Sequence, residues 1–434
     1  MAANPDDSAS QNLAVYIVFG VARTVVNDRI KKLLRLRRLF DKMVLVTPGK
    51  QNSDDSEGVE VKPLPNPTGI FQRLGLTRLR KTLDQYLFFP SPHILFVLTA
   101  RRKLLKFIAD DLAQGKHVCL LTGAPPHGVG LIGLYIKHKF PQVHWIIDWQ
   151  DLWSYDENYY YITPKLYRNR LKKCEQRMLQ TADMNVTTNA HAKAVLEEHY
   201  GVPPSRTSFI HHHFDREDVA GEHNDTPTQT IARHGDAIKL GFLGTLFKPP
   251  RVPGGDLVAA LAQLRASGRN VELHVHGLLP RDYEQSKEHL REAGIIMHGP
   301  SSHEEAVKQL AQYDFLLLLL ADLPNCKVVM SIKLPHYLMM GKPILAIVPE
   351  RSAIADIITD TGAGVVIPTH SDWSAELRKI LGKGLQDDGI PQRNEAMVNQ
   401  FEWEKVSTQW CDLLAAAAHV SKKRKEHNPN STHS

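Results

Sequence analysis

The sequence alternates short apolar runs with longer amphipathic segments, and it does so twice, with a polar stretch between the two series. Strands separated by helical segments form parallel sheets with helices on both faces, so this alternation constrains the fold more than any other feature. With 434 residues and 42% hydrophobic content, the chain can bury two separate cores. We therefore predict an α/β protein with two Rossmann-like domains that face each other across a cleft.

The first series predicts an N-terminal domain over residues 1–216. The apolar run 13–19 ends at Gly20, and a helix over 24–40 leads to a strand at 43–46. This order is typical of a β-strand–helix–β-strand unit. Further strands are expected at 117–121, 143–147, 184–187 and 208–210, with helices that start at Gly128 and Lys165.

The polar stretch 217–237 shows no periodicity and predicts a linker. A C-terminal domain is expected over 238–394, followed by a helix over 395–420 and a disordered basic tail over 421–434. The strands of this second domain are expected at 239–243, 271–276, 295–298, 315–320, 343–347 and 364–367.

Composition narrows the class of protein. The 53 basic and 47 acidic residues are too evenly balanced for a dedicated nucleic-acid binder. No apolar run approaches the roughly 20 residues of a membrane helix, and the run 13–19 is expected to be a strand and not a signal peptide. The cysteines form no CxxC pair, which fits a reducing cytoplasm: Cys119, Cys174, Cys326 and Cys411.

The region from Phe71 to Phe107 mixes basic and aromatic residues and allows two interpretations. It can be a packed helical excursion with solvated charges. Alternatively, it forms a surface for peripheral contact with the cytoplasmic face of a membrane or with a glycolipid, because interfacial segments pair these residue types.

A candidate phosphate-binding loop follows the strand at 239–243. In open α/β sheets, ligands bind beyond the carboxyl ends of strands. The loop contains Gly244, which allows close approach of the backbone, and Thr245, followed by the cations Lys248 and Arg251. An exposed turn with two basic residues is the structural alternative.

A second candidate anion site in the same domain is the helix expected to open at Ser331. A helix N-terminus offers unpaired N–H groups and a partial positive charge, to which Lys333 would add a full charge. Two anion sites in one domain predict binding of a diphosphate.

In the first domain, His127 and the pair Asp148 and Asp151 each follow a predicted strand. The two carboxylates lie among tryptophans, and the imidazole can bond a sugar hydroxyl, which suggests a carbohydrate site. A structural histidine and helix-capping aspartates are the alternatives.

Neither a metal nor a cofactor is expected. The three consecutive histidines 211–213 point to alternate faces of an extended segment and cannot surround one ion. No DxD-type acidic pair follows a strand in the second domain, so we expect metal-free chemistry.

These residues resemble the retaining GT-B glycosyltransferases of family four over nearly the whole chain. Pro125-Pro126-His127 is similar to the family's P-P-H segment, and 145–153 resembles its W-x-x-D-F-R-D-P-W run, with Trp149, Gln150 and Leu152 replacing F, R and P. Residues 242–246 resemble Y-x-G-T-L/F, and 331–346 resembles S-x-K-L-x-E-Y-L-x-x-G-K-P-I-L-A.

The resemblance implies that Gly244, Thr245 and Lys248 approach the phosphates of the donor and that the helix at Ser331 faces the same diphosphate. Glu402 and Trp403 match the segment that opens the family's terminal helix, which crosses back to the first domain.

Two positions depart from the family pattern. His336 replaces the glutamate that binds the donor ribose, which puts nucleotide choice and activity in question. The segment 212–215 stands where the family usually has N-G-F-D.

The expected function is metal-independent transfer of a hexose from a nucleoside diphosphate sugar to a glycan or lipid-linked acceptor, with retention of configuration, in polysaccharide biosynthesis. Two alternatives are a GT-B protein that binds a nucleotide sugar without transferring it, and a sugar-nucleotide epimerase. An NAD enzyme is disfavoured because no G-x-G-x-x-G follows the first strand.

Overall fold

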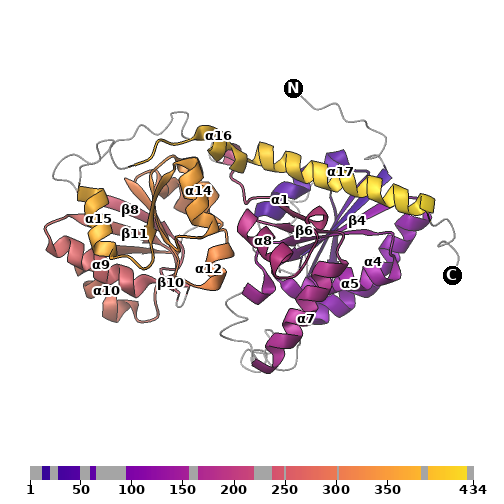
Figure 1. Ribbon diagram of the computed structural model, residues 1–434, viewed down its shortest axis with the longest axis horizontal. Coiled ribbons are helices and arrows are strands. Elements are labelled where there is room, and N and C mark those ends of the chain that lie inside the picture. The colour runs from indigo at the N-terminus through magenta and orange to yellow at the C-terminus, as the bar shows by residue number, and fades with distance from the viewer. Residues whose placement is uncertain are drawn as a thin grey trace. The chain divides into compact units, whose positions relative to one another are not determined.

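A computed structural model of the chain shows an α/β protein that divides into two compact units (Figure 1). Unit 1 contains Met1–His211 together with Val406–Ser434, and unit 2 contains His212–Lys405. The expected linker 217–237 lies almost entirely outside the described residues. The described residues are 12–19, 28–48, 59–64, 94–155, 165–218, 237–248, 251–300, 303–382 and 390–427.

Unit 1 is built on a seven-stranded parallel sheet in the order β3-β2-β1-β4-β5-β6-β7. Its central strands are buried over their whole length, as the continuous apolar runs predict for a sheet covered on both faces. The strands are β1 (Leu13–Val18), β2 (Lys42–Pro48), β3 (Glu60–Leu64), β4 (His117–Ala124), β5 (His144–Trp149), β6 (Met184–Thr187) and β7 (Thr207–Phe209).

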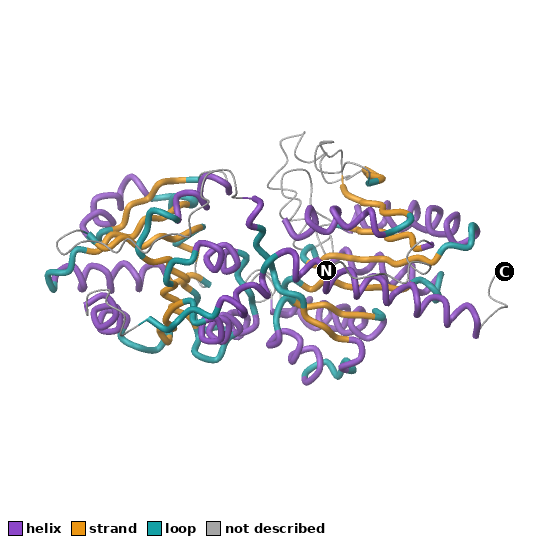
Figure 2. Tube along the Cα trace, turned by 90° about the horizontal axis from the view of Figure 1, so that it is seen from above, coloured by secondary structure: helices purple, strands orange, loops and turns teal. Residues whose placement is uncertain are grey.

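Helices cover both faces of this sheet, so that in Figure 2 its strands lie between helical layers. Helices α4, α5 and α7 pack side by side in that order. Arg29 of α1 instead lies 4.9 Å from the Trp410 ring of α17. The longer helices are α1 (Asp28–Leu34), α4 (Ile94–Ala113), α5 (Gly130–Lys139), α7 (Lys165–Thr181), α8 (Ala190–Glu198) and α17 (Trp403–His427).

The outer parts of unit 1 differ most from the expected elements. Of the helix expected over 24–40, residues 24–27 lie outside the described part, Asp28–Leu34 form α1, and Arg35–Leu39 form a 3-10 helix. Strand β3 was not expected, because its sequence E-V-K-P-L contains two charges and a proline; at a sheet edge this composition is tolerated. Of the region Phe71 to Phe107, residues 71–93 lie outside the described part, and the rest belongs to α4, with Phe96 fully buried.

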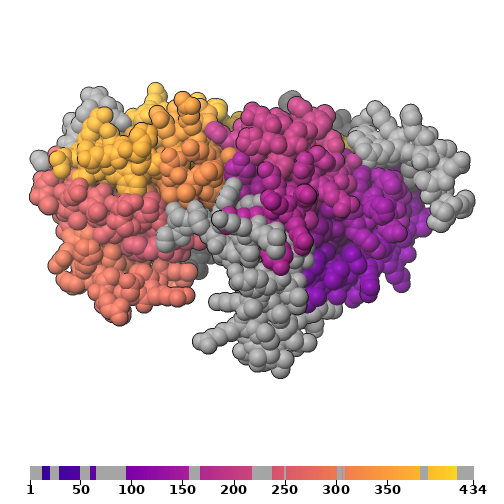
Figure 3. All heavy atoms as spheres, turned by 60° about the horizontal axis from the view of Figure 1, so that its bottom comes forward, coloured from indigo at the N-terminus to yellow at the C-terminus, as the bar shows by residue number. Residues whose placement is uncertain are grey.

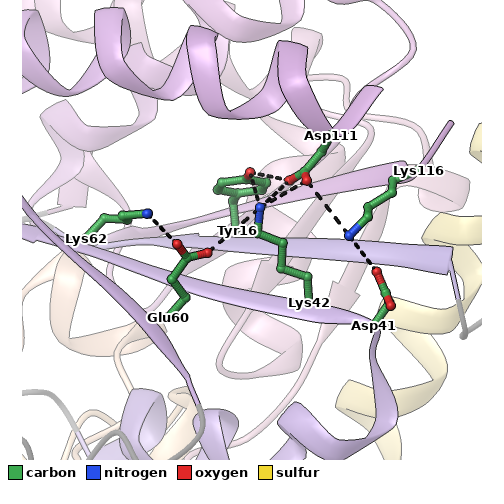
Figure 4. Close-up of polar contacts among 7 residues, drawn as sticks. All are labelled: Tyr16, Asp41, Lys42, Glu60, Lys62, Asp111 and Lys116. Carbon is green, nitrogen blue, oxygen red and sulfur yellow. Dashed lines mark hydrogen bonds and ion pairs between the residues drawn. The ribbon is translucent and has the colours of Figure 1, made fainter. Parts of the chain in front are cut away.

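A balanced charge network ties the amino-terminal ends of the unit 1 strands to the end of α4. The buried Asp111 accepts a hydrogen bond from the Tyr16 hydroxyl and one from Lys42 Nζ at 2.9 Å. Burial, and then the bond to Asp111, raises the pKa of Tyr16 above its usual value. Ligands of α/β folds bind beyond the carboxyl ends of the strands, whereas this network lies at their amino-terminal ends, so we interpret it as structural. Figure 4 shows its members: Tyr16, Asp41, Lys42, Glu60, Lys62, Asp111 and Lys116.

Unit 2 is built on a six-stranded parallel sheet in the order β12-β11-β8-β13-β14-β15. Two apolar clusters form its core, one of which includes Leu316 and Ile344 and the other Leu240 and Phe315. The strands are β8 (Ile238–Leu243), β11 (Val271–His276), β12 (Ile295–Gly299), β13 (Phe315–Leu319), β14 (Ile344–Val348) and β15 (Gly364–Pro368), with a separate hairpin of β9 (Phe247–Lys248) and β10 (Val252–Pro253).

Helices α9 to α14 of unit 2 lie between successive strands of its sheet, as the alternating sequence predicts, and α15 and α16 follow the last strand. They are α9 (Gly254–Ala266), α10 (Tyr283–Glu292), α11 (His303–Leu310), α12 (Pro324–Val328), α13 (Lys333–Met340), α14 (Ala353–Thr361), α15 (Trp373–Gly382) and α16 (Glu395–Val398).

The terminal helix α17 leaves unit 2 and joins unit 1 from Val406 onward. Its buried residues include Trp410 and Leu414. The helix continues to His427, so the expected disordered tail is wrong for 421–427, and 428–434 lie outside the described residues. Among the described helices, none combines the length and the apolar character needed to cross a bilayer.

Candidate functional site

The strand orders locate the ligand-binding edge of each unit. In unit 2 the direction of sheet growth reverses between β8 and β13, and in unit 1 it reverses between β1 and β4. Ligands of open α/β sheets bind beyond the carboxyl ends of the strands at such switch points. The residues that follow β8, β13 and β4 are therefore the ones to compare with the expected site.

Gly244 follows β8 and is fixed between two neighbours. Its φ of +103° lies in the left-handed region that favours glycine, and its N–H donates to the His276 carbonyl oxygen at 2.7 Å. A Cβ on Gly244 would lie 3.0 Å from Lys333 Cε, and a Cβ on Gly277 would lie 2.1 Å from the Gly244 carbonyl oxygen. The absence of both side chains lets these segments pack closely. Thr245 follows and is half-buried.

Lys333 is the first residue of α13, and its ammonium group lies beside the Gly244 loop. Its Nζ is 4.2 Å from the centroid of the Phe242 ring, a cation–π contact. The pKa of Lys333 is lowered to about 7, first by burial and then by the positive charges of Arg251 and Lys248. Within the described part of the chain, no carboxylate forms an ion pair with Lys333. A bound anion would relieve this electrostatic cost.

The other two cations flank the tip of the β9–β10 hairpin. Lys248 pairs with Val252 in the hairpin ladder and is exposed, whereas Arg251 is half-buried. The Arg251 carbonyl oxygen accepts the Ala321 N–H at 2.9 Å, which fixes the hairpin to the segment after β13. The structure thus brings the three expected cations together at the switch point of unit 2.

Helix α13 begins at Lys333, two residues later than expected. Ser331 precedes it, and the Ser331 hydroxyl accepts the Lys333 N–H at 3.4 Å. The buried hydroxyl of Tyr337 accepts the Leu243 N–H at 2.9 Å, which holds the first turns of α13 against the end of β8. The N-terminus of an eight-residue helix therefore adds its partial positive charge to that of Lys333.

His336 lies one turn into α13, and its Nδ1 is 3.1 Å from the Ile332 carbonyl oxygen. Because a carbonyl oxygen only accepts, Nδ1 carries the proton and Nε2 of the neutral ring is the acceptor.

In unit 1, His127 follows β4 at the switch point and is almost fully buried. Its ring stacks on Trp153 at 5.4 Å with an interplanar angle of 6°. Its Nε2 lies 2.9 Å from the Asp151 carbonyl oxygen, so Nε2 carries the proton and Nδ1 is the acceptor of the neutral ring. The Asp151 backbone thus orients His127, and the Asp151 side chain is half-buried.

Asp148, at the end of β5, is fully buried and paired. Its two oxygens accept from Arg29 Nε and Nη2, each at 3.0 Å, and Gln150 Nε2 donates to it at 3.3 Å. Arg29 also donates to the carbonyl oxygens of Ile210 and His211, at 3.0 and 2.7 Å. These contacts join three distant segments and give Asp148 an arginine partner inside the protein.

Residues 33–218, which include His127, Asp148 and Asp151, match the model of Glycosyltransferase Family 4. No curated protein matches the chain by sequence. The chain has the GT-B fold, its residues 33–218 are similar to Glycosyltransferase Family 4, and together these findings identify a glycosyltransferase.

Solved structures align with this glycosyltransferase over nearly its full length. Sucrose-phosphate synthase from Thermosynechococcus elongatus is 15% identical, with a TM-score of 0.60, and the match covers 92% of this chain and 98% of that one. A glycosyltransferase from Rickettsia africae is 12% identical with a TM-score of 0.59, covering 93% and 98%. HepE from Anabaena, in complex with UDP and glucose, is 14% identical with a TM-score of 0.59, covering 92% and 99%. At these identities the structural likeness establishes the fold alone.

Sequence reasoning missed Arg29 as the partner of Asp148. The two residues are 119 positions apart, and α1 showed only a basic helical pattern. In the glycosyltransferase's described residues, no three His, Cys, Asp or Glu side chains are arranged to hold a metal ion.

Proposed function

We propose that this glycosyltransferase transfers a hexose from a nucleoside diphosphate sugar to a hydroxyl of a glycan or lipid-linked acceptor, in polysaccharide biosynthesis. The observation that carries the proposal is the convergence of Lys333, Lys248 and Arg251 beside Gly244 at the switch point of unit 2. A partly desolvated cluster of cations next to a closely packed glycine loop suits a diphosphate. The HepE structure holds UDP and glucose on the same fold, which supports a uridine donor as the first to test.

The three cations and the N-terminus of α13 would stabilise the negative charge that develops on the departing diphosphate. Such preorganised charges lower the barrier to departure of the leaving group. We propose that they act in place of a metal ion.

For the chemical step we propose retention of configuration. The bond from the anomeric carbon to the diphosphate oxygen breaks, and the bond to the acceptor oxygen forms on the same face of the sugar. The acceptor hydroxyl proton moves to an oxygen of the leaving phosphate, so the step needs no protein base.

Unit 1 would position the sugar and the acceptor. His127, with Nδ1 as acceptor, would take a hydrogen bond from a donor-sugar hydroxyl, since Asp151 and Trp153 fix the ring. The half-buried Asp151 side chain would position the acceptor. We assign buried Asp148 a positioning role through Arg29.

The test is a thermal-shift panel of UDP, GDP, dTDP and their sugars, with and without EDTA, because a ligand of the native state raises its melting temperature. We expect a shift for one nucleotide family that survives EDTA and is lost in Lys333→Met. The matched control is Lys379→Met, which removes an exposed lysine of α15. No shift with any nucleotide would refute the donor site. Binding followed by no transfer to any acceptor would leave a nucleotide-sugar-binding protein.

We further propose peripheral contact with the cytoplasmic face of a membrane, through the basic face of α7. Its one acidic residue, Glu175, is fully buried and accepts the Ser154 N–H at 3.1 Å. The helix forms part of the surface coloured magenta in Figure 3. A cationic face attracts anionic headgroups, which suits a lipid-linked acceptor. Its exposed basic residues are Arg170, Lys172, Lys173 and Arg177.

Co-sedimentation with vesicles of phosphatidylglycerol and phosphatidylcholine tests this contact. We expect binding to fall in Lys172→Glu/Lys173→Glu and to persist in Lys287→Glu, an exposed change on α10 of unit 2. Equal binding of all three proteins, or no binding by the wild type, would refute it.

A further inference from the structure

A cluster of three histidines lies on one face of β11 and β12. His274 and His276 alternate along β11 and therefore share a face, and a register shift between Val275 and His276 aligns His298 of β12 with them. The His298 ring stacks on His276 at 4.4 Å with an interplanar angle of 5°, and on His274 at 5.2 Å and 15°. His274 Nδ1 lies 2.9 Å from His298 Nε2. Because like charges on stacked rings repel each other, protonation of more than one of these imidazoles is unfavourable.

Tyr313 links this cluster to β8. Its hydroxyl is 2.6 Å from His276 Nε2, and its ring covers Gly241 so closely that a Cβ there would lie 2.2 Å from Tyr313 Cδ2. Tyr313 therefore connects Gly241 of β8 to His276 of β11. Both Tyr313 and His276 are buried.

The backbone of the same residue supports the donor loop. The His276 carbonyl oxygen accepts the Gly244 N–H at 2.7 Å, and the next residue, Gly277, packs against the Gly244 carbonyl. The position of Gly244, and with it the contact to Lys333, thus depends on the end of β11.

We propose that His276 is a positioning residue for the Gly244 loop and that the neutral histidine cluster is required for tight donor binding, so that acidification releases the nucleotide sugar. The proposal rests on the proposed function. Protonation places like charges on stacked rings, and the exposed His298 is the member that a proton from solvent reaches most directly. Repulsion then separates the rings, loosens the end of β11 and displaces Gly244.

The surrounding charges favour the neutral state. Burial lowers the pKa of each of the three histidines, that of His276 to about 4, and the neighbouring imidazoles lower those of His274 and His276 further. Glu272, 3.3 Å from His274 Nε2, acts in the opposite direction, and Lys239 adds to the lowering. Tyr313 stays a neutral phenol, because burial raises its pKa to about 12.

The lowered pKa values of the three histidines determine how the stability of the folded protein changes with pH. The folded protein binds fewer protons at the cluster than the unfolded chain does, so its stability increases with pH up to the ordinary histidine pKa of about 6.5. As pH falls below about 6.5, the closed cluster progressively loses stability relative to a form in which the rings are separated and protonated. Donor binding is then linked to proton release and weakens in the same range.

At about pH 6 and about pH 5, Lys333 stays largely an ammonium because its pKa is about 7, so its titration does not mask that of the histidine cluster. The first measurement is the Kd of UDP-glucose for the full chain at these two pH values, by titration calorimetry. This probe is a diphosphate diester and keeps its charge over that range. We expect binding to be roughly three- to tenfold weaker at the lower pH. His276→Gln/His298→Gln, whose amides can bond but do not titrate, should bind equally at both pH values. His289→Gln, an exposed change on α10, should behave as the wild type.

Equal affinity of the wild type at both pH values, tighter binding at the lower pH, or the same pH dependence in the glutamine variant would overturn the proposal. A second readout needs no ligand and separates this proposal from the donor assignment. Hydrogen exchange of the Gly244 amide, corrected for its intrinsic pH dependence, should be faster at about pH 5 in the wild type and unchanged in the variant. Equal protection at both pH values would overturn the inference even if UDP-glucose binds, whereas failure to bind at about pH 6 refutes only the donor assignment.

Discussion

The lowered pKa of Lys333 predicts that donor binding weakens on the alkaline side of neutrality. In the proposed donor site the ammonium form of Lys333 binds the diphosphate, and with a pKa of about 7 half of the ligand-free protein carries this form at pH 7. At about pH 8.5 the charged fraction is roughly one in thirty, so the affinity for UDP-glucose should fall about fifteenfold between these pH values. Deprotonation of Lys333 thus weakens binding as pH rises, whereas protonation of the histidine cluster is expected to weaken binding as pH falls.

Titration calorimetry with UDP-glucose at several pH values measures this loss of affinity with rising pH. Lys333→Arg should remove it while keeping most of the affinity, because a guanidinium stays charged throughout this range. Lys333→Met should bind weakly at every pH. An affinity of the wild type that stays constant from pH 7 to about pH 8.5 would refute the reasoning, since Lys333 would then either keep its proton or not contact the donor.

Three further predictions concern other positions. Gly244→Ala should weaken UDP-glucose binding at least about tenfold by calorimetry, because the new Cβ would press on Lys333 and φ at this position is +103°; unchanged affinity would contradict the loop assignment. Asp148→Asn should destabilise unit 1 by about 3–5 kcal/mol in urea denaturation, since it leaves Arg29 buried without its counter-charge; a loss below about 1 kcal/mol would show that Arg29 is compensated elsewhere. His127→Phe keeps an aromatic stack but removes the ring nitrogens, so kcat should fall by roughly 10- to 100-fold with little change in melting temperature; a normal kcat would exclude the positioning role.

The grouping of Gly244 with Lys248 and Arg251 after β8 could be predicted from the sequence because its signals are local. Gly244 directly follows an apolar strand, and Lys248 and Arg251 come within seven residues of it. The start of α13 was misplaced by two residues because the Ser331 hydroxyl accepts from Lys333 without entering the helix. The core strands were found for the same reason, since β13 and β14 are short apolar runs with clear ends.

The remaining features depend on contacts between distant segments. Nothing in the pattern around Asp148 indicates that Arg29 would pair with it, because the pairing is decided by how α1 packs. The histidine cluster was also missed, although the alternation of His274 and His276 along β11 was visible. That alternation places two rings on one face, but only the register shift beside Val275 brings His298 to them.

The division of the chain has a consequence for how it folds during synthesis. Unit 2 is continuous in sequence, whereas unit 1 is completed by residues from Val406 onward, including Trp410 against the Arg29 guanidinium. The ribosome therefore releases every part of unit 2 before it releases the last helix of unit 1. We expect unit 2 to reach its native state first. Until α17 is synthesised, the sheet of unit 1 lacks this helix, and Arg29 lacks its contact with Trp410. Chaperone dependence of this glycosyltransferase should accordingly fall on its N-terminal half.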